Sequence, residues 1–207
     1  MSKDREAVLG DKFNEFVTAW HKGKKHLEEM TMDDVVLLKS ALSTVNNIAT
    51  LKTEELLVKR LSELSAAIDK KREGILRAIK NKSANANGFD IQWSDGINFV
   101  AEVKCNMPIN GKDAFGSKQR EGILGDLQKL RSGNKKTSLK GLDANTLEGY
   151  YKFLGVYVHS EKSKKAVRAF CDGSECQRFG KTKLLDTDTK IAKLDKNTIY
   201  IVMLGND

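Results

Sequence analysis

Apolar residues recur at helical spacing through the first 80 residues of the chain and at strand spacing after that. Residues 4–50 predict two helices: the first carries an apolar face that reaches Trp20, and the second has Thr31 as its N-cap, followed by acidic residues. A longer helical pattern covers residues 53–80, and the basic "KKR" at 70–72 indicates a break within it. The N-terminal part is therefore expected to be helical.

The segment "GFDIQWSDGINFVAEVKCNMP" has the strongest strand character in the chain. Residues 89–93 and 97–105 alternate, and "SDG" between them predicts a three-residue hairpin loop with Gly96 in the left-handed position. In this register Trp93 faces Ile97, Ile91 faces Phe99 and Phe89 faces Ala101, which forms one apolar face. A two-residue "DG" loop would shift the pairing by one residue, pair Trp93 with Asn98 and place the acids of the two strands on opposite faces, so we prefer the three-residue loop.

A further helix and further strands follow the hairpin. The helix is expected over 118–133, ended by Gly133, and strand candidates are found at 152–160, 165–171 and 197–204, the middle one as a strand or a turn. This order predicts an α/β fold with a mixed β-sheet flanked by helices, and no internal repeat is visible. We divide the chain into a helical N-terminal extension, 1–52, and a core, 53–207.

The composition is that of an ordinary globular protein, with 40% hydrophobic and 31% charged residues. The formal net charge of +8 favours association with polyanions but does not by itself identify one. No apolar run is long enough to cross a membrane, and the charged N-terminus lacks a signal core, so we expect a cytoplasmic protein. The odd count of three cysteines, without a signal peptide, indicates reduced thiols. We do not expect a zinc site at "CDGSEC", because no second pair of zinc ligands follows it.

The predicted hairpin carries charges inside its apolar runs. Alternation places Asp90 on the same face as Glu102 and Lys104, where two carboxylates repel each other and lose hydration when covered. A divalent cation relieves both problems, and Mg²⁺ accepts two carboxylates together with a strand carbonyl such as that of Val103. The Lys104 ammonium could then offset charge that develops on a phosphate. The alternative is an edge hairpin in which Glu102 and Lys104 form an ordinary surface pair.

These residues resemble the PD-(D/E)XK nuclease superfamily, which includes restriction endonucleases. Asp90 matches its first acid, Glu102 and Lys104 match its acid-x-Lys strand, and Phe89 replaces the usual proline. The resemblance covers about residues 70–160 and implies a restriction-endonuclease-like core. It implies Asp90, Glu102 and the Val103 carbonyl as Mg²⁺ ligands, and Asp90, Glu102 and Lys104 as catalytic residues.

The resemblance also suggests supporting residues around this site. Glu73 could supply the acid that many members carry on the preceding helix, and Gln119 the glutamine that some place near the phosphate. Plain helix residues are the alternative for both. Lys118 and Arg120, with the loop residues Lys135 and Lys136, would contact the DNA backbone, although loop lysines are also found simply in solvent.

The function implied by the resemblance is Mg²⁺-dependent cleavage of double-stranded DNA, most simply by a small type II restriction endonuclease. Cutting both strands with one core per chain implies a homodimer, and the N-terminal helices could form its interface or clamp DNA. The alternatives are another nuclease of this superfamily in repair or recombination, a non-catalytic basic DNA-binding protein, and a basic helical interaction protein in which "AEVKC" is coincidence.

Overall fold

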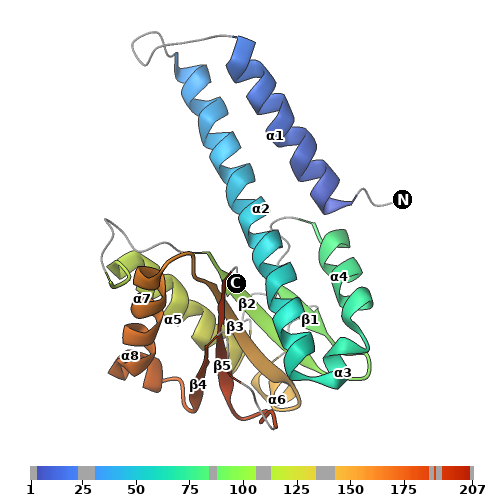
Figure 1. Ribbon diagram of the computed structural model, residues 1–207, viewed down its shortest axis with the longest axis vertical. Coiled ribbons are helices and arrows are strands. Elements are labelled where there is room, and N and C mark those ends of the chain that lie inside the picture. The colour runs from blue at the N-terminus through green and yellow to red at the C-terminus, as the bar shows by residue number, and fades with distance from the viewer. Residues whose placement is uncertain are drawn as a thin grey trace.

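The protein is an α/β structure in which helices cover both faces of a five-stranded sheet (Figure 1). The computed structural model describes residues 4–22, 31–83, 88–105, 113–133, 143–186, 189 and 193–205. Its helices are α1 (Arg5–Lys22), α2 (Met32–Leu64), α3 (Ala66–Asp69), α4 (Arg72–Asn81), α5 (Ser117–Ser132), α6 (Ala144–Leu147), α7 (Glu161–Asp172) and α8 (Ser174–Gln177). Its strands are β1 (Ile91–Trp93), β2 (Phe99–Lys104), β3 (Tyr151–Tyr157), β4 (Thr182–Leu185) and β5 (Ile199–Leu204).

The sheet is mixed, with strand order β1-β2-β3-β5-β4. β1 is antiparallel to β2, and the other neighbouring strands are parallel. Parallel strands need crossover helices, and α5 supplies one between β2 and β3. Because helices cover both faces, the central strands have continuous apolar runs, and every residue of β5 is buried. The predicted α/β class with a mixed sheet is confirmed.

Each face of the sheet has its own apolar core. On one face, the second half of α2 packs with α3 and α4 against residues such as Phe99, Phe153 and Tyr200. On the other face, α5 to α8 pack against residues such as Val100 and Leu154. α2 lies so close to β3 that a Cβ added at Gly155 would come within 3.1 Å of Leu57 Cδ2.

The first half of α2 extends beyond the sheet and pairs with α1 in a long helical hairpin (Figure 1). Thr31 caps α2 as expected: its side chain accepts a hydrogen bond from the Asp34 amide, and Asp34 accepts one from Thr31 N. The boundary that we drew at 52/53 falls within this continuous helix, which belongs to the hairpin at one end and to the core at the other.

The predicted register of the β1–β2 hairpin is wrong by two residues. Ile91 pairs with Ala101 and Trp93 with Phe99, so the connection runs over 94–98 and is longer than "SDG". Two side chains contact this wider loop: Trp93 Nε1, at the end of β1, donates to the Asp95 carbonyl at 2.9 Å, and Lys71, outside the hairpin, forms an ion pair with Asp95 at 2.8 Å. A shift of two residues keeps Ile91 and Trp93 on the face predicted for them, with Phe99 and Ala101, but Phe89 lies before β1 and packs in the core on the other face.

The strand or turn predicted at 165–171 is also wrong, because this segment lies in α7. Ala166, Val167 and Phe170 are buried at helical spacing, and Ser160 caps the helix by accepting from the Ser163 amide. The strand between α8 and β5 is instead β4, a four-residue strand at the edge of the sheet.

Candidate functional site

Asp90 lies immediately before β1, beside the end of β2 that carries Glu102 and Lys104. Its Oδ2 accepts a hydrogen bond of 2.8 Å from the backbone amide of Val103. The amide and carbonyl of one strand residue point to the same side, so the Val103 carbonyl also faces the β1 edge of the sheet. Asp90 and the Val103 carbonyl, two of the three predicted ligands, therefore lie at this edge.

Glu102 is a buried acid, with its side chain only 5% exposed. Burial, and next the negative charge of Asp90, raise its pKa to about 8, although Lys129 opposes the shift. Lys129 Nζ lies 2.5 Å from Glu102 Oε1 and also donates to the carbonyl of Gly88. Glu102 is therefore not the surface partner of Lys104 that a solvated edge hairpin would have.

Lys104 forms its ion pair with Asp126 of α5, at 2.9 Å. Burial lowers the pKa of Lys104, but the charges of Asp126, Asp90 and Glu102 outweigh it and give a net upward shift. Burial raises the pKa of Asp126, although the nearby Lys104 ammonium acts to lower it. The site is thus a partly buried arrangement of alternating acids and ammonium groups.

The other face of the sheet adds Glu54 of α2 and Lys82, which follows α4. Lys82 donates to the backbone carbonyls of Phe89 and Asp90, and burial lowers its pKa. Burial raises the pKa of Glu54 to about 7; Arg5 opposes this shift and Asp90 adds to it. Asp90 is therefore an electrostatic neighbour of acids on helices from both faces of the sheet.

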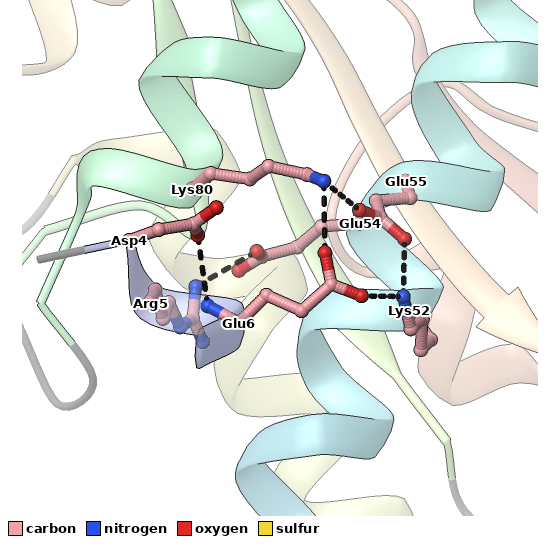
Figure 2. Close-up of polar contacts among 7 residues, drawn as sticks. All are labelled: Asp4, Arg5, Glu6, Lys52, Glu54, Glu55 and Lys80. Atoms are coloured by element: carbon pink, nitrogen blue, oxygen red, sulfur yellow. Dashed lines mark hydrogen bonds and ion pairs between the residues drawn. The ribbon is translucent and has the colours of Figure 1, made fainter. Parts of the chain in front are cut away.

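Glu54 also joins a polar network that fixes the start of α1 (Figure 2). Arg5 Nη1 lies 2.9 Å from Glu54 Oε2, and both side chains are buried. Next to them, Glu6 forms ion pairs with Lys52 at 2.5 Å and with Lys80 at 2.8 Å. The hydrogen bonds from these two lysines lower the pKa of Glu6 to about 2. These contacts attach the start of α1 to α2 and α4, beside the site.

The sequence contained a signal for Asp126 and Glu54, which we did not predict. Asp126 falls on the apolar stripe of α5 formed by Ile123, Leu127 and Leu130, and Glu54 falls on that of α2 formed by Leu51, Val58 and Leu61. An acid on a stripe that packs against a sheet must be buried, and a buried acid needs a partner. Lys129 and Lys82 carry no comparable signal, because lysines are common at helix ends.

The supporting residues that we predicted are placed elsewhere or serve other contacts. Glu73 is exposed in the first turn of α4, beside the turn end of the hairpin, about 13 Å along the helix from Lys82. Gln119 accepts from the Gly116 amide and so caps α5. Lys118 is exposed, and Arg120 forms an ion pair with Glu175.

Lys135 and Lys136 lie outside the described residues.

The donor set can be tested against a divalent cation. Among the described residues, no group of three or more His, Cys, Asp and Glu side chains could hold a metal ion. What remains is two carboxylates, Asp90 and Glu102, with the Val103 carbonyl. The buried oxygens Glu102 Oε1 and Asp126 Oδ2 each face an ammonium at ion-pair distance without a well-aligned hydrogen bond. Buried acidic oxygens of this kind fit a hard cation that is bound by oxygen.

The chain matches no family model, no curated protein and no solved structure. In the part of the chain that the structure describes, no helix is long and apolar enough to span a membrane.

Proposed function

We propose that this protein is a Mg²⁺-dependent DNA endonuclease with a restriction-endonuclease-like core, and that it is a type II restriction enzyme. The observation that carries the proposal is the buried Glu102 beside Asp90, with Lys104 two residues further along the same strand. Keeping two acids together in a largely covered position costs stability. A catalytic or binding task that needs both acids would explain why this cost is tolerated. The order α4, β1, β2, α5, β3 adds support, because it follows the helix, hairpin, helix and strand of the resemblance.

Asp90, Glu102 and the Val103 carbonyl would hold the cation. When bound, Mg²⁺ supplies positive charge to the phosphate oxygens and acidity to a water molecule. Glu102 must give up its proton to bind a cation, so its raised pKa makes occupancy increase with pH. Lys104 would leave Asp126 and place its ammonium against the charge that develops on the phosphate.

The net charge of +8 supports a polyanionic substrate, since basic proteins encounter DNA rapidly. A non-catalytic DNA-binding protein is the second candidate. It is favoured by the pairing of Glu102 with Lys129 and of Lys104 with Asp126, which would also be found in a purely structural ion network.

Plasmid and genomic DNA incubated with the protein and Mg²⁺, or with EDTA, test the proposal. Discrete fragments indicate a restriction enzyme, a smear indicates a non-specific nuclease, and intact DNA supports the binding protein. We expect Lys104→Ala to abolish cleavage and to leave the affinity for DNA within about threefold, because many other phosphate contacts supply the affinity. Lys183→Ala removes the same charge from the exposed side of β4 and is the matched control.

Metal binding can be followed without measuring cleavage. A ligand that binds only the folded state raises its stability, so Mg²⁺ should raise the melting temperature of the wild type. Asp90→Asn should reduce this increase, whereas Lys104→Ala should retain it. An increase that is equal in wild type and Asp90→Asn would show that the cation binds elsewhere.

A further inference from the structure

Lys129 of α5 contacts one of the two acids that would bind the proposed cation. Its ammonium lies 2.5 Å from Glu102 Oε1, and its side chain is 23% exposed. The same ammonium donates a hydrogen bond to the carbonyl of Gly88 and lies 5.2 Å from the centroid of the Phe89 ring. Three contacts therefore hold this lysine against the carboxylate, although the function proposed above gives it no role.

The other two lysines at the site have different partners. Lys104 forms its ion pair with Asp126, and Lys82 donates to the backbone carbonyls of Phe89 and Asp90. Within the described ranges, neither of them forms an ion pair with Glu102. Lys129 is thus the positive charge that a metal ion would meet at this carboxylate.

The charge of Lys129 opposes the binding of a divalent cation in either protonation state of Glu102. If Glu102 is ionised, the cation adds two positive charges to the site. If Glu102 holds a proton, this proton must leave, and the site still gains one positive charge. An ammonium at ion-pair distance repels the added charge, and water screens this repulsion weakly because the Glu102 side chain is only 5% exposed.

A purely structural role of Lys129 predicts the opposite effect. Its hydrogen bond to Gly88 holds the backbone two residues before Asp90, so its loss would release Asp90 and weaken a cation site. Asp90 has two supports that do not involve Lys129, however. Its Oδ2 accepts from the Val103 amide at 2.8 Å, and its carbonyl accepts from Lys82 at 3.0 Å. We therefore expect the effect of charge to exceed the effect of position.

We propose that Lys129 competes with the divalent cation for the Glu102 carboxylate, and so keeps the affinity of the site for metal low. This inference rests on the function proposed above, because it takes Glu102 as a metal ligand. On cation binding the ammonium would leave Glu102 and keep the carbonyl of Gly88 and the ring of Phe89 as partners. Removal of this charge should therefore strengthen the binding of metal.

Equilibrium binding of Mn²⁺ to the full chain tests the competition. The electron paramagnetic resonance signal of free Mn²⁺ measures binding directly, at one fixed pH and ionic strength, and Mn²⁺ accepts the same oxygen ligands as Mg²⁺. Lys129→Met removes the charge and keeps an unbranched side chain, so we expect at least ~10-fold tighter binding than in the wild type. Lys129→Arg keeps the charge and should stay within about threefold of the wild type.

Three further variants separate this effect from others. Lys71→Met removes a lysine that pairs with Asp95 at 2.8 Å in the hairpin loop, and should leave the affinity for Mn²⁺ unchanged. Asp90→Asn should weaken binding both in the wild type and in Lys129→Met, because the metal then loses a carboxylate. Lys129→Gln can still donate to Gly88 and should bind Mn²⁺ more tightly than the wild type. Urea unfolding with EDTA checks that every variant is folded.

Each contrary result has a distinct meaning. Equal or weaker binding by Lys129→Met, with wild-type binding that depends on Asp90, would overturn the competition and leave the proposed metal site and function intact. A gain in Lys129→Arg equal to that in Lys129→Met would assign the effect to side-chain shape. An equal gain in Lys71→Met would assign it to net charge, and either result would overturn the inference. Binding that is independent of Asp90 in every variant would reject the metal site itself, and the proposed function with it.

Discussion

Glu102→Gln should stabilise the metal-free protein at neutral and alkaline pH. The substitution keeps the shape of the side chain and removes the ionisation that burial and Asp90 make unfavourable. Lys129 loses a carboxylate partner but keeps the carbonyl of Gly88, 2.5 Å from its ammonium. The free energy of unfolding is therefore expected to rise although the substitution removes one partner of an ion pair, whereas the loss of an ion pair would ordinarily lower it.

The size and sign of the effect follow from linkage. The pKa of Glu102 is about 8 in the folded protein, against 4.5 for the unperturbed group. Between these values the folded state holds a proton that the unfolded state has lost, so the free energy of unfolding falls as the pH rises through this window. The wild type loses about 3 kcal/mol from this residue by pH 7, and about 5 kcal/mol above the folded pKa. Glutamine does not titrate, so the variant escapes this loss.

Urea unfolding of wild type and Glu102→Gln at about pH 5, 6, 7 and 8, with EDTA present throughout, measures the difference. The stability of the variant relative to the wild type should increase steadily across the series, while other titrating groups largely cancel. Glu121→Gln, an exposed acid on α5, is the matched control and should show a flat difference. A flat difference for Glu102→Gln, or one that reverses with pH, would refute the assignment of a buried, proton-holding Glu102.

Three further predictions concern the site and the core. Asp90→Asn should stop cleavage and make DNA binding less dependent on Ca²⁺, measured by gel shift at one fixed salt concentration; a wild type indifferent to metal in both assays would contradict the metal site. Asp126→Asn should lower the pKa of Lys104, so that the alkaline limit of cleavage moves to lower pH, and an unchanged pH profile would mean that the pair is not coupled to activity. Gly155→Ala should destabilise the fold by about 1–3 kcal/mol in chemical denaturation, because its Cβ would crowd Leu57. The control Gly125→Ala, on α5, should not destabilise the fold, because its Cβ would meet nothing within 4 Å. Equal free energies of unfolding for the two variants would contradict the close packing at Gly155.

Local patterns were sufficient for much of the fold. Helical spacing and the Thr31 cap predicted the start of α2, although this helix continues to Leu64 where we expected separate helical segments at 4–50 and 53–80. Alternation predicted that Ile91 and Trp93 share a face with Phe99. Ile91 and Trp93 kept their predicted face despite the error in the hairpin register, because a slip of two residues preserves the faces of a strand, whereas Phe89 before β1 did not. The helix at 165–171 was also readable in retrospect, from Ser160 as its cap and from the helical spacing of Ala166 and Phe170.

Only the tertiary structure decided which residues surround the predicted acids. The sequence determines that Asp126 and Glu54 lie on apolar stripes, but not that α5 and α2 cover opposite faces of the sheet and approach Asp90 from both sides. The loop over 94–98 likewise contacts Lys71, which is distant in sequence. Periodicity reports the neighbours of a residue along one element, whereas burial, pKa and ion pairing depend on how separate elements pack together.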